Sequence, residues 1–495
     1  MGPVRQFFIY GISGAASRLA AIILVPLYTR TLALEDFGRL ELAMAVHTLV
    51  VIIGGLQVES AVARDYFEAL RSGRQSAFRS TALALTLVGS LAALIVLSLI
   101  SVVGWLGVWF SPLELIVIGC MTLPAQLLGV QLVMLRFDGK PLNYAALSAF
   151  DLTVTAAFSA WFILGLKWGV MGALLGILAG KASSVIAGWA VTFGFTRHLR
   201  HWIRPTREYA RSMLAYGIPG MPAVLVSWLQ NTGNRLVLAS VMPLQEVAIA
   251  GLALKAAAVF GFVIYSLRLA WEPYSISNLV RHEHDPAFFS RALERYALAM
   301  YLVLSIVLLS TPWFVRLLAP PSYGEAATVA LFMMTAQYWV GMGNMAVIGV
   351  HGARQTSRLL PIYGWGAVAN VAVLLVAARW LGPLVAGIGL LAGTVISAIL
   401  TVRISNRIFS TNFSLRLVGF SLLATTVSSA VLLALLGHLG SSMTSDPRQA
   451  AVWLGGGGAV LFAGGLVLAV FGIGLERCRG LLLEAIQPLR RVTGA

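Results

Sequence analysis

Four cations lie deep inside long apolar stretches of this sequence, where an ionised side chain is rarely placed without a function. They are Arg18, Lys181, Arg235 and Lys255. A charged group inside a bilayer is costly unless it faces water or a partner of opposite charge. Arginine also binds phosphate and pyrophosphate oxygens through two parallel hydrogen bonds. We therefore expect these residues to line a polar cavity that neutralises an anion.

Arg18 is the sharpest of the four cases. It lies about eleven residues into the first apolar stretch, which places it near the middle of a bilayer at about 1.5 Å of helix rise per residue. Arg18 either faces an internal cavity or forms a buried ion pair with Glu59 that fastens two helices together. Both interpretations stay open at the level of sequence.

Arg235 ends the segment QNTGNR, in which Gln230, Asn231 and Asn234 make one half of an apolar stretch polar. A membrane helix with this many amides is expected to line water or a polar ligand. Lys181 and Lys255 could face the same cavity or bond a backbone carbonyl, and the sequence does not decide between these roles.

The charges inside the apolar stretches are unequal in sign. Arg268 raises the number of cations to five, whereas Glu59 and Asp151 are the two acids counted there. Arg268 and Glu272 are four residues apart and are expected to form an ordinary ion pair on one helix. Asp151 begins its stretch and is expected to cap it or to join an ion pair. The surplus of cations favours an anionic ligand and argues against a carrier of cationic drugs.

The elements that must position these residues are membrane-spanning helices. The chain has 495 residues, of which 59% are hydrophobic and only 11% charged; a soluble protein carries about a quarter charged residues. Hydropathy predicts an all-α polytopic membrane protein of about fourteen transmembrane helices, each about 20 residues long. The predicted spans are 7–29, 42–63, 81–104, 113–135, 146–166, 169–193, 213–241, 247–270, 297–319, 327–350, 361–380, 383–402, 416–437 and 451–474.

The loops between these spans carry most of the positive charge on one side. Of the 35 Lys and Arg residues, 24 lie on that side and six on the other. Because cytoplasmic loops are enriched in Lys and Arg, this bias predicts both termini in the cytoplasm of a bacterial inner membrane. The formal charge of +16 is thereby explained by topology, and no nucleic-acid partner is expected.

A weak internal repeat divides the chain. GALLGILAG at 172–180 and GLLAGTVIS at 389–397 share small residues at the same spacing. Six helices preserve orientation, so two such lobes would be related by an axis along the membrane normal. We predict a six-helix lobe at 1–205, a second six-helix lobe at 206–410, and two further helices with a basic cytoplasmic tail at 411–495.

The segment from Pro26 to Leu42, PLYTRTLALEDFGRLEL, resembles the opening of the polysaccharide transporter, or oligosaccharide flippase, family. That family belongs to the superfamily of MATE exporters and lipid II flippases (the MOP superfamily). AVARDYFE at 61–68, NRLVLASVMPLQEVAIAGLALK at 234–255 and WEPY at 271–274 resemble further family segments in the same order. The resemblance implies a two-lobed, MATE-like carrier. Such a carrier moves an undecaprenyl-pyrophosphate-linked oligosaccharide to the periplasmic leaflet by alternating access through a cationic cavity.

One departure bears on ion coupling. In the helix predicted at 213–241, the family often has Asp directly before the arginine, where the present chain has Asn234. A role of that acid in H⁺ or Na⁺ coupling would then be absent or moved to Glu59. No cofactor is expected. The implied partners are the lipid-linked oligosaccharide of O-antigen, capsule or exopolysaccharide synthesis, membrane lipids, and a polysaccharide polymerase with its chain-length regulator; the chain is expected to be a monomer.

Three other functions were weighed against this one. A lipid II-type flippase would carry the same pyrophosphate, whereas a MATE-like multidrug or cation antiporter would need an acidic lumen. A membrane enzyme such as a polymerase or ligase would need a large periplasmic loop, and the predicted periplasmic loops are short. We expect no catalytic residues and no metal site, because His282 and His284 have no third ligand near them in the sequence.

Overall fold

The computed structural model describes residues 22–104, 106–193, 205–281, 286–353, 355–409, 411–439 and 444–474. Throughout these ranges the regular elements are helices, and no strand is assigned in them. Twelve of the described helices are long and apolar enough to cross a membrane. Helix α13 (Ala326–Ala346) is also 21 residues long and coincides with the predicted span 327–350. The prediction of an all-α polytopic membrane protein is thus confirmed.

The first predicted span, 7–29, lies mostly outside the described residues. Its described end contributes α2 (Val25–Thr31), a helix of seven residues with Pro26 in its first turn. Proline is tolerated there because the first backbone N–H groups of a helix have no partner in the helix. Arg18 falls before residue 22 and lies outside the described residues.

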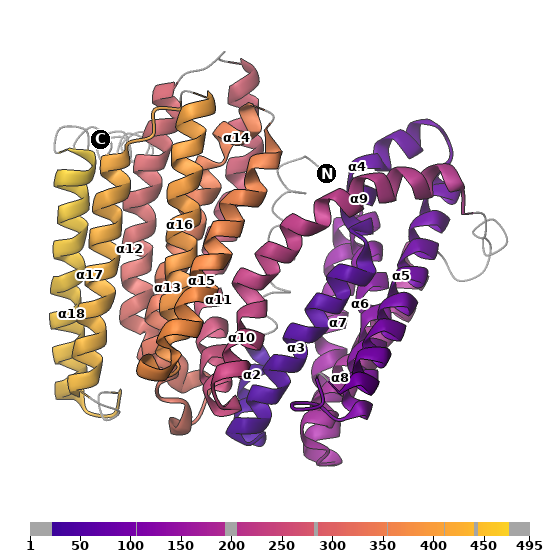
Figure 1. The fold of residues 1–495 in the computed structure, drawn as a ribbon, viewed down its shortest axis with the longest axis horizontal. Coiled ribbons are helices and arrows are strands. Elements are labelled where there is room, and N and C mark those ends of the chain that lie inside the picture. Colours follow the sequence, from indigo (N-terminus) through magenta and orange to yellow (C-terminus); the bar gives the residue numbers. More distant parts are fainter. Residues whose placement is uncertain are drawn as a thin grey trace, which may run out of the picture. The chain divides into compact units, whose positions relative to one another are not determined.

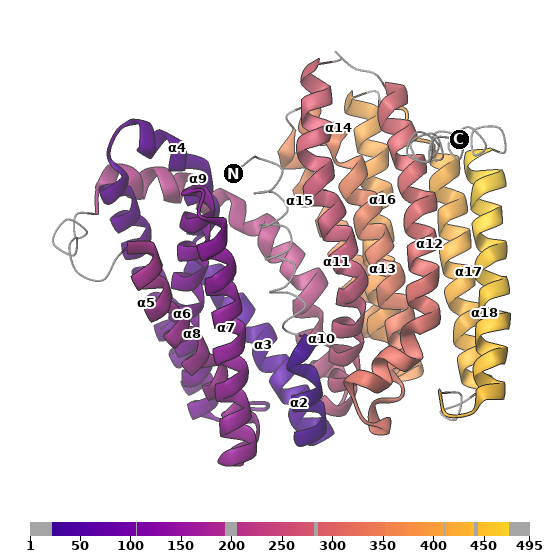
Figure 2. The same cartoon turned by 180° about the vertical axis from the view of Figure 1, so that it is seen from behind.

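The chain divides into two compact units, Met1–Gly251 and Leu252–Ala495. Figures 1 and 2 show both units as sets of long helices running up and down. The predicted boundaries at 205/206 and 410/411 rest on the internal repeat, and they stay a prediction.

Unit 1 is built on packing of α3 against α5 and α6, and of α8 against α6 and α7. Local signals set several ends: at α6, Ser111 and Glu114 form a reciprocal capping box, followed by Pro112, which satisfies two otherwise unpaired backbone donors. The helices of unit 1 are α2, α3 (Leu34–Gly55), α4 (Val58–Arg71), α5 (Gln75–Val103), α6 (Pro112–Phe137), α7 (Pro141–Ala160), α8 (Gly169–Phe193), α9 (Arg207–Trp228), α10 (Asn234–Val241) and the start of α11 (Leu244–Arg281).

Unit 2 is centred on α16, which packs against α13, α14 and α15. Its most buried large side chains include Trp339, Tyr338 and Tyr301. Helix α12 starts at Pro286 and is one continuous helix of 33 residues. The helices after α11 are α12 (Pro286–Leu318), α13, α14 (Ile348–Gly352), α15 (Leu359–Leu381), α16 (Leu384–Phe409), α17 (Leu415–Leu439) and α18 (Pro447–Val467).

Two membrane segments of unit 1 are interrupted in their middle. The segment 34–71 is broken between α3 and α4, where Leu56 and Gln57 have φ of 48° and 57°, a left-handed conformation unusual for residues with a side chain. The segment 207–241 contains Pro219 and Pro222 and changes from α9 to α10 through a π-helical turn, Leu229–Gly233. Breaks of this kind in membrane helices free backbone groups and often accompany function.

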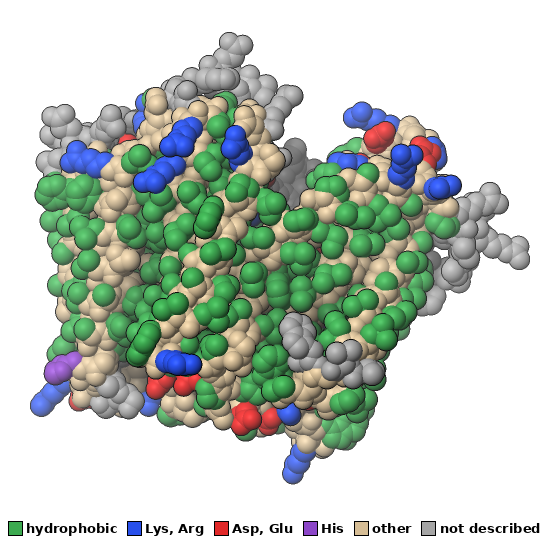
Figure 3. Space-filling model, in the orientation of Figure 1, with side chains coloured by type: hydrophobic (Ala, Val, Ile, Leu, Met, Phe, Trp, Pro, Cys, Tyr) green, Lys and Arg blue, Asp and Glu red, His purple; other side chains and the backbone are tan. Residues whose placement is uncertain are grey.

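The surface agrees with a membrane location. Apolar side chains cover the middle of the visible face, and charged side chains gather at its two ends (Figure 3). Such a division between an apolar band and charged rims is expected where the band faces hydrocarbon and the rims face water.

Candidate functional site

Arg235 forms a buried ion pair with Glu41 in unit 1. Its Nη1 atom lies 2.9 Å from Glu41 Oε2, and the two side chains are 11% and 2% exposed. Arg235 also donates to the Glu41 backbone carbonyl at 3.4 Å. Arg235 is the second residue of α10, while Glu41 lies in α3, which begins at Leu34 rather than at the predicted residue 42. The count of two acids inside the spans was therefore too low.

The amides near Arg235 are divided between two faces. Gln230 and Asn234 are buried, with 4% and 5% exposure, whereas Asn231 is half-buried and donates to the Ser227 carbonyl at 2.8 Å. The indole of Trp228 donates to the Ala45 carbonyl of α3 at 3.3 Å. The π-helical turn is thus fixed against α3 on one side and presents Asn231 on the other.

Lys181 pairs with the second acid of the sequence analysis. Its Nζ atom lies 2.5 Å from Asp151 Oδ2, which joins α8 to α7 with 28% and 18% exposed side chains. The expectation that Asp151 belongs to an ion pair is confirmed. Arg235 and Lys181 therefore have different acid partners, and Lys255 lies in α11 within unit 2.

Glu59 has an exposed side chain in α4. Its carboxylate lies against Gly129 of α6, where an added Cβ atom would come within 1.9 Å of Glu59 Oε1. Glycine at 129 therefore allows the carboxylate to approach α6. The ion pair between Glu59 and Arg18, and any role of Glu59 in ion coupling, stay predictions.

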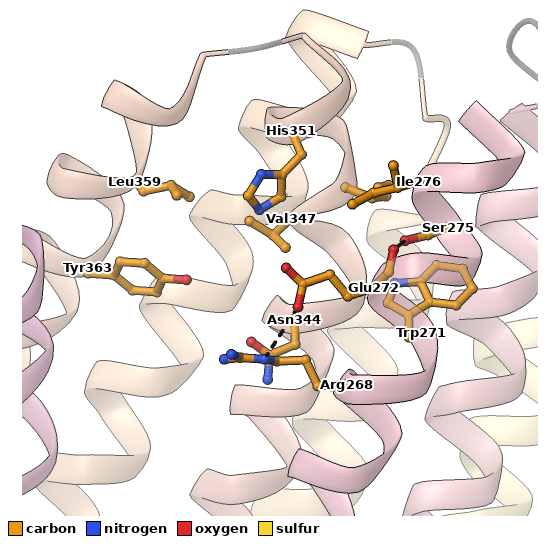
Figure 4. Close-up of a pocket in the computed structure, with 11 residues that line it drawn as sticks. Arg268, Trp271, Glu272, Ser275, Ile276, Asn344, Val347, His351, Leu359 and Tyr363 are labelled. Carbon is orange, nitrogen blue, oxygen red and sulfur yellow. Dashed lines mark hydrogen bonds and ion pairs between the residues drawn. The ribbon is translucent and has the colours of Figure 1, made fainter. Parts of the chain in front are cut away.

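Unit 2 contains a separate cavity of about 160 Å³ between α11, α13, α14 and α15, lined by both polar and apolar side chains. Figure 4 shows the Glu272 carboxylate between the Arg268 guanidinium and the ring of His351, with Tyr363 pointing in from α15 and Asn344 from α13. Arg268 Nε and Glu272 Oε2 are 4.0 Å apart, and both side chains are about half exposed. The predicted ion pair between them is confirmed, but it is loose and solvent-accessible.

This donor set can bind an oxygen-rich anion. A guanidinium, an imidazole, an amide and a phenol converge on the cavity, and Glu272 competes with an incoming anion for Arg268. Sequence reasoning missed His351, Asn344 and Tyr363 as site residues. They come from three helices more than 70 residues after Arg268, so no local spacing connects them.

Metal ligands do not gather in the described ranges: no group of three His, Cys, Asp or Glu residues there could hold a metal ion.

The membrane-length helices of the described ranges, grouped in two compact units, define the class as a multi-pass helical membrane protein. The sequence matches the family described as "Polysaccharide biosynthesis protein" over residues 4–279. The chain belongs to this family. No curated protein matches the sequence significantly.

Solved structures show the same fold at low sequence identity. A lipid II flippase, MurJ, in an inward closed conformation has a TM-score of 0.67 and 13% identity, covering 95% of this chain and 99% of its own. An inward-facing multidrug resistance MATE transporter of the MOP superfamily has a TM-score of 0.62 and 16% identity. The match covers 80% of this chain and 98% of the transporter. A third structure is a MOP superfamily transporter from Pyrococcus furiosus, described as having a binding pocket of reverse polarity. It has a TM-score of 0.54 and 17% identity, and the match covers 84% of this chain and 98% of the transporter.

Proposed function

We propose that this protein is a flippase that moves an undecaprenyl-pyrophosphate-linked oligosaccharide from the cytoplasmic to the periplasmic leaflet of a bacterial inner membrane by alternating access. The observation that carries the proposal is the match to the polysaccharide biosynthesis family over residues 4–279, in a chain whose fold is that of MOP transporters. The cations Arg235 and Arg268 support an anionic substrate. Both termini lie in the cytoplasm in this proposal.

These two cations can serve such a substrate by exchange of partners. Arg235 is held by Glu41 and Arg268 by Glu272. A pyrophosphate would have to replace these carboxylates, which then act as internal anions that occupy the site when the substrate has left. Arg18, Lys181, Lys255, Asn231 and Asn234 are the further proposed substrate contacts, and Glu59 is the proposed coupling residue for H⁺ or Na⁺.

Deletion of the gene tests the proposal directly. We expect lipid-linked oligosaccharide to accumulate in the cytoplasmic leaflet and surface polysaccharide to be lost, and both to recover with the wild-type gene. Arg18→Ala and Arg235→Ala should lower export at normal protein levels. Normal surface polysaccharide in a deletion strain without a paralogue would refute the function.

A lipid II-type flippase is the second candidate, favoured by the coverage of the lipid II flippase structure. The same deletion separates the two, because loss of lipid II transport would stop cell-wall synthesis rather than surface polysaccharide. A MATE-like antiporter would instead change the resistance of the cells to cationic drugs. The polymerase and the chain-length regulator are proposed partners of the protein, which is proposed to act as a monomer.

A further inference from the structure

The Glu272 carboxylate lies between a guanidinium and an imidazole in the cavity of unit 2. On one side is Arg268 of the same helix, α11, and on the other is His351 of α14 (Figure 4). An arginine is charged at every physiological pH, whereas an imidazole changes its charge between about pH 5 and pH 8. The carboxylate therefore has one permanent cationic neighbour and one neighbour whose charge depends on pH.

The contact between Glu272 and Arg268 is loose. Arg268 Nε and Glu272 Oε2 are 4.0 Å apart, which is longer than a hydrogen bond. In the buried ion pair of unit 1 between Arg235 and Glu41, the corresponding distance is 2.9 Å. Arg268 and Glu272 are both about half exposed, so water screens their attraction. A second cation beside Glu272 can therefore draw the carboxylate away from Arg268.

Two further polar side chains reach the same cavity from other helices. Asn344 comes from α13 and Tyr363 from α15, and the Tyr363 hydroxyl points into the cavity (Figure 4). Within the described ranges neither side chain forms a hydrogen bond with the protein, although both are half-buried. An amide NH₂ and a phenol O–H are hydrogen-bond donors. Together with the Arg268 guanidinium they supply donors from three helices to one small space.

The size of the cavity limits its ligand. Its volume of about 160 Å³ is well below the roughly 300–1,000 Å³ of pockets that enclose drug-sized molecules. Apolar side chains complete the lining, among them Val347, Ile348 and Leu359, and they leave few other polar groups to compete for the donors. A single oxyanion of the phosphate type suits this space, and any longer group attached to it would extend outside.

The elements that pack most closely against α14 bring no other charge to His351. They are α13, α16 and the 3₁₀ turn Thr356–Arg358. Their charged side chains in the described ranges are exposed and lie outside the cavity lining: Arg358, Arg403 and Arg407. The titratable Tyr338 of α13 donates to a backbone carbonyl of α12 instead. The acid beside His351 is thus Glu272, and the other titratable group of the lining is Tyr363.

We propose that the cavity of unit 2 is a proton-linked binding site for an oxyanion of the phosphate type. When His351 gains a proton, the Glu272 carboxylate moves to the imidazolium and leaves Arg268. The freed guanidinium then binds the oxyanion with the help of Asn344 and Tyr363. Proton uptake and anion binding favour one another, because linked equilibria are reciprocal. The site follows from the cavity alone and does not depend on the flippase proposal.

Calorimetry with inorganic pyrophosphate tests the site on the full-length protein in phosphatidylcholine nanodiscs at about pH 6 and about pH 8. The variant His351→Gln shows the pH dependence that belongs to pyrophosphate itself. Beyond that reference, the Kd of the wild type should fall about fivefold more from pH 8 to pH 6, a modest change because the charges are exposed and screened. Arg268→Gln should bind one pyrophosphate fewer at both pH values.

Glu272→Gln separates an exchange of partners from a simple gain of charge. Removing the competing carboxylate should lower the Kd at pH 8 by about threefold or more, and the pH effect due to His351 should shrink below about twofold. Arg403→Gln and His438→Gln replace exposed side chains outside the cavity and should change neither the Kd nor its pH dependence.

Three results would overturn the proposal. They are a full pH effect in His351→Gln, weaker binding or an undiminished pH effect in Glu272→Gln, and an unchanged number of bound pyrophosphates in Arg268→Gln. The replaced side chains are exposed or about half exposed, so we expect the variants to fold, and thermal unfolding checks this.

A second probe, undecaprenyl pyrophosphate, identifies the source of the oxyanion. A Kd at least about tenfold lower than that of inorganic pyrophosphate, with the same dependence on His351 and Glu272, assigns the site to a lipid headgroup. Equal Kd values assign it to a phosphate compound in solution, and either result supports the site. Export in the deletion strain reports on the proposed function separately. Normal export there leaves the site standing, and loss of the proton linkage leaves the function standing.

Discussion

The ion pair between Arg235 and Glu41 gives the sharpest test of the structure. Its 2.9 Å separation and side-chain exposures of 11% and 2% place it near the buried limit, where removing one partner costs about 3–5 kcal/mol. Glu41→Gln keeps the shape beside Gly251 but leaves the Arg235 charge uncompensated. We expect a loss of about 3 kcal/mol, which is about 150-fold in the unfolding equilibrium.

A double-mutant cycle measures this coupling. Glu41→Gln, Arg235→Gln and the double variant are unfolded in mixed micelles, and their free energies of unfolding are compared with that of the wild type. The double variant removes both charges, so it should be more stable than the sum of the single losses by at least about 2 kcal/mol. A coupling below about 0.5 kcal/mol would refute the pair and the packing of α10 on α3 that forms it.

The same variants separate a structural role of Arg235 from a binding role. If Arg235 only fastens α10 to α3, polysaccharide export should recover together with stability in the double variant. If Arg235 binds substrate, the double variant should be stable and still fail to export.

Three further predictions test packing, a second ion pair and orientation. Gly217→Ala should destabilise the folded protein by about 1–3 kcal/mol, because the added Cβ atom would come 2.1 Å from a backbone oxygen. At Gly220 on the same helix an added Cβ atom meets nothing within 4 Å, and thermal unfolding of both alanine variants checks this. Asp138→Asn should cost about 2 kcal/mol by leaving the largely buried Arg79 charge without its acid, and chemical unfolding with Arg79→Gln as the cycle partner measures the loss. In a cysteine-free background, an impermeant thiol reagent should label Ser322→Cys in intact cells and Ser72→Cys only after permeabilisation, since both positions are exposed; the reverse pattern would invert the topology.

Hydropathy predicted the membrane-spanning helices well, because each span is a long apolar run of the length needed to cross the hydrocarbon core of a bilayer. Helix α12 begins earlier than the predicted span 297–319, at Pro286, and proline suits the first turn of a helix. The missed break between α3 and α4 has a physical reason. Leu56 and Gln57 adopt positive φ without glycine, so no residue type announces the change of direction.

The candidate sites were less predictable than the spans. Glu41 was placed outside the predicted spans because the sequence LEDFGRLE looked like a charged loop. In the structure α3 begins there, and Glu35 and Asp36 suit its first turn. Its partner Arg235 lies 194 residues away, and no periodicity links the two. Lys181 and Asp151 are 30 residues apart in the sequence. An ion pair was anticipated for Asp151 from its supposed place at the start of a span, but α7 begins at Pro141 and Asp151 lies inside the helix.

Whether an arginine such as Arg235 has an acid partner says more about its role than its depth in the membrane does. A cation near mid-bilayer must keep a partner at every stage, since its solvation cost does not vanish when the substrate leaves. Glu41 would supply that partner for Arg235, so binding there is an exchange of one anion for another. Glu41→Gln should then hold a pyrophosphate lipid more tightly and release it more slowly, with a lower turnover per molecule of folded protein. Faster release from Glu41→Gln than from the wild type, measured as the dissociation rate of undecaprenyl pyrophosphate, would contradict the exchange.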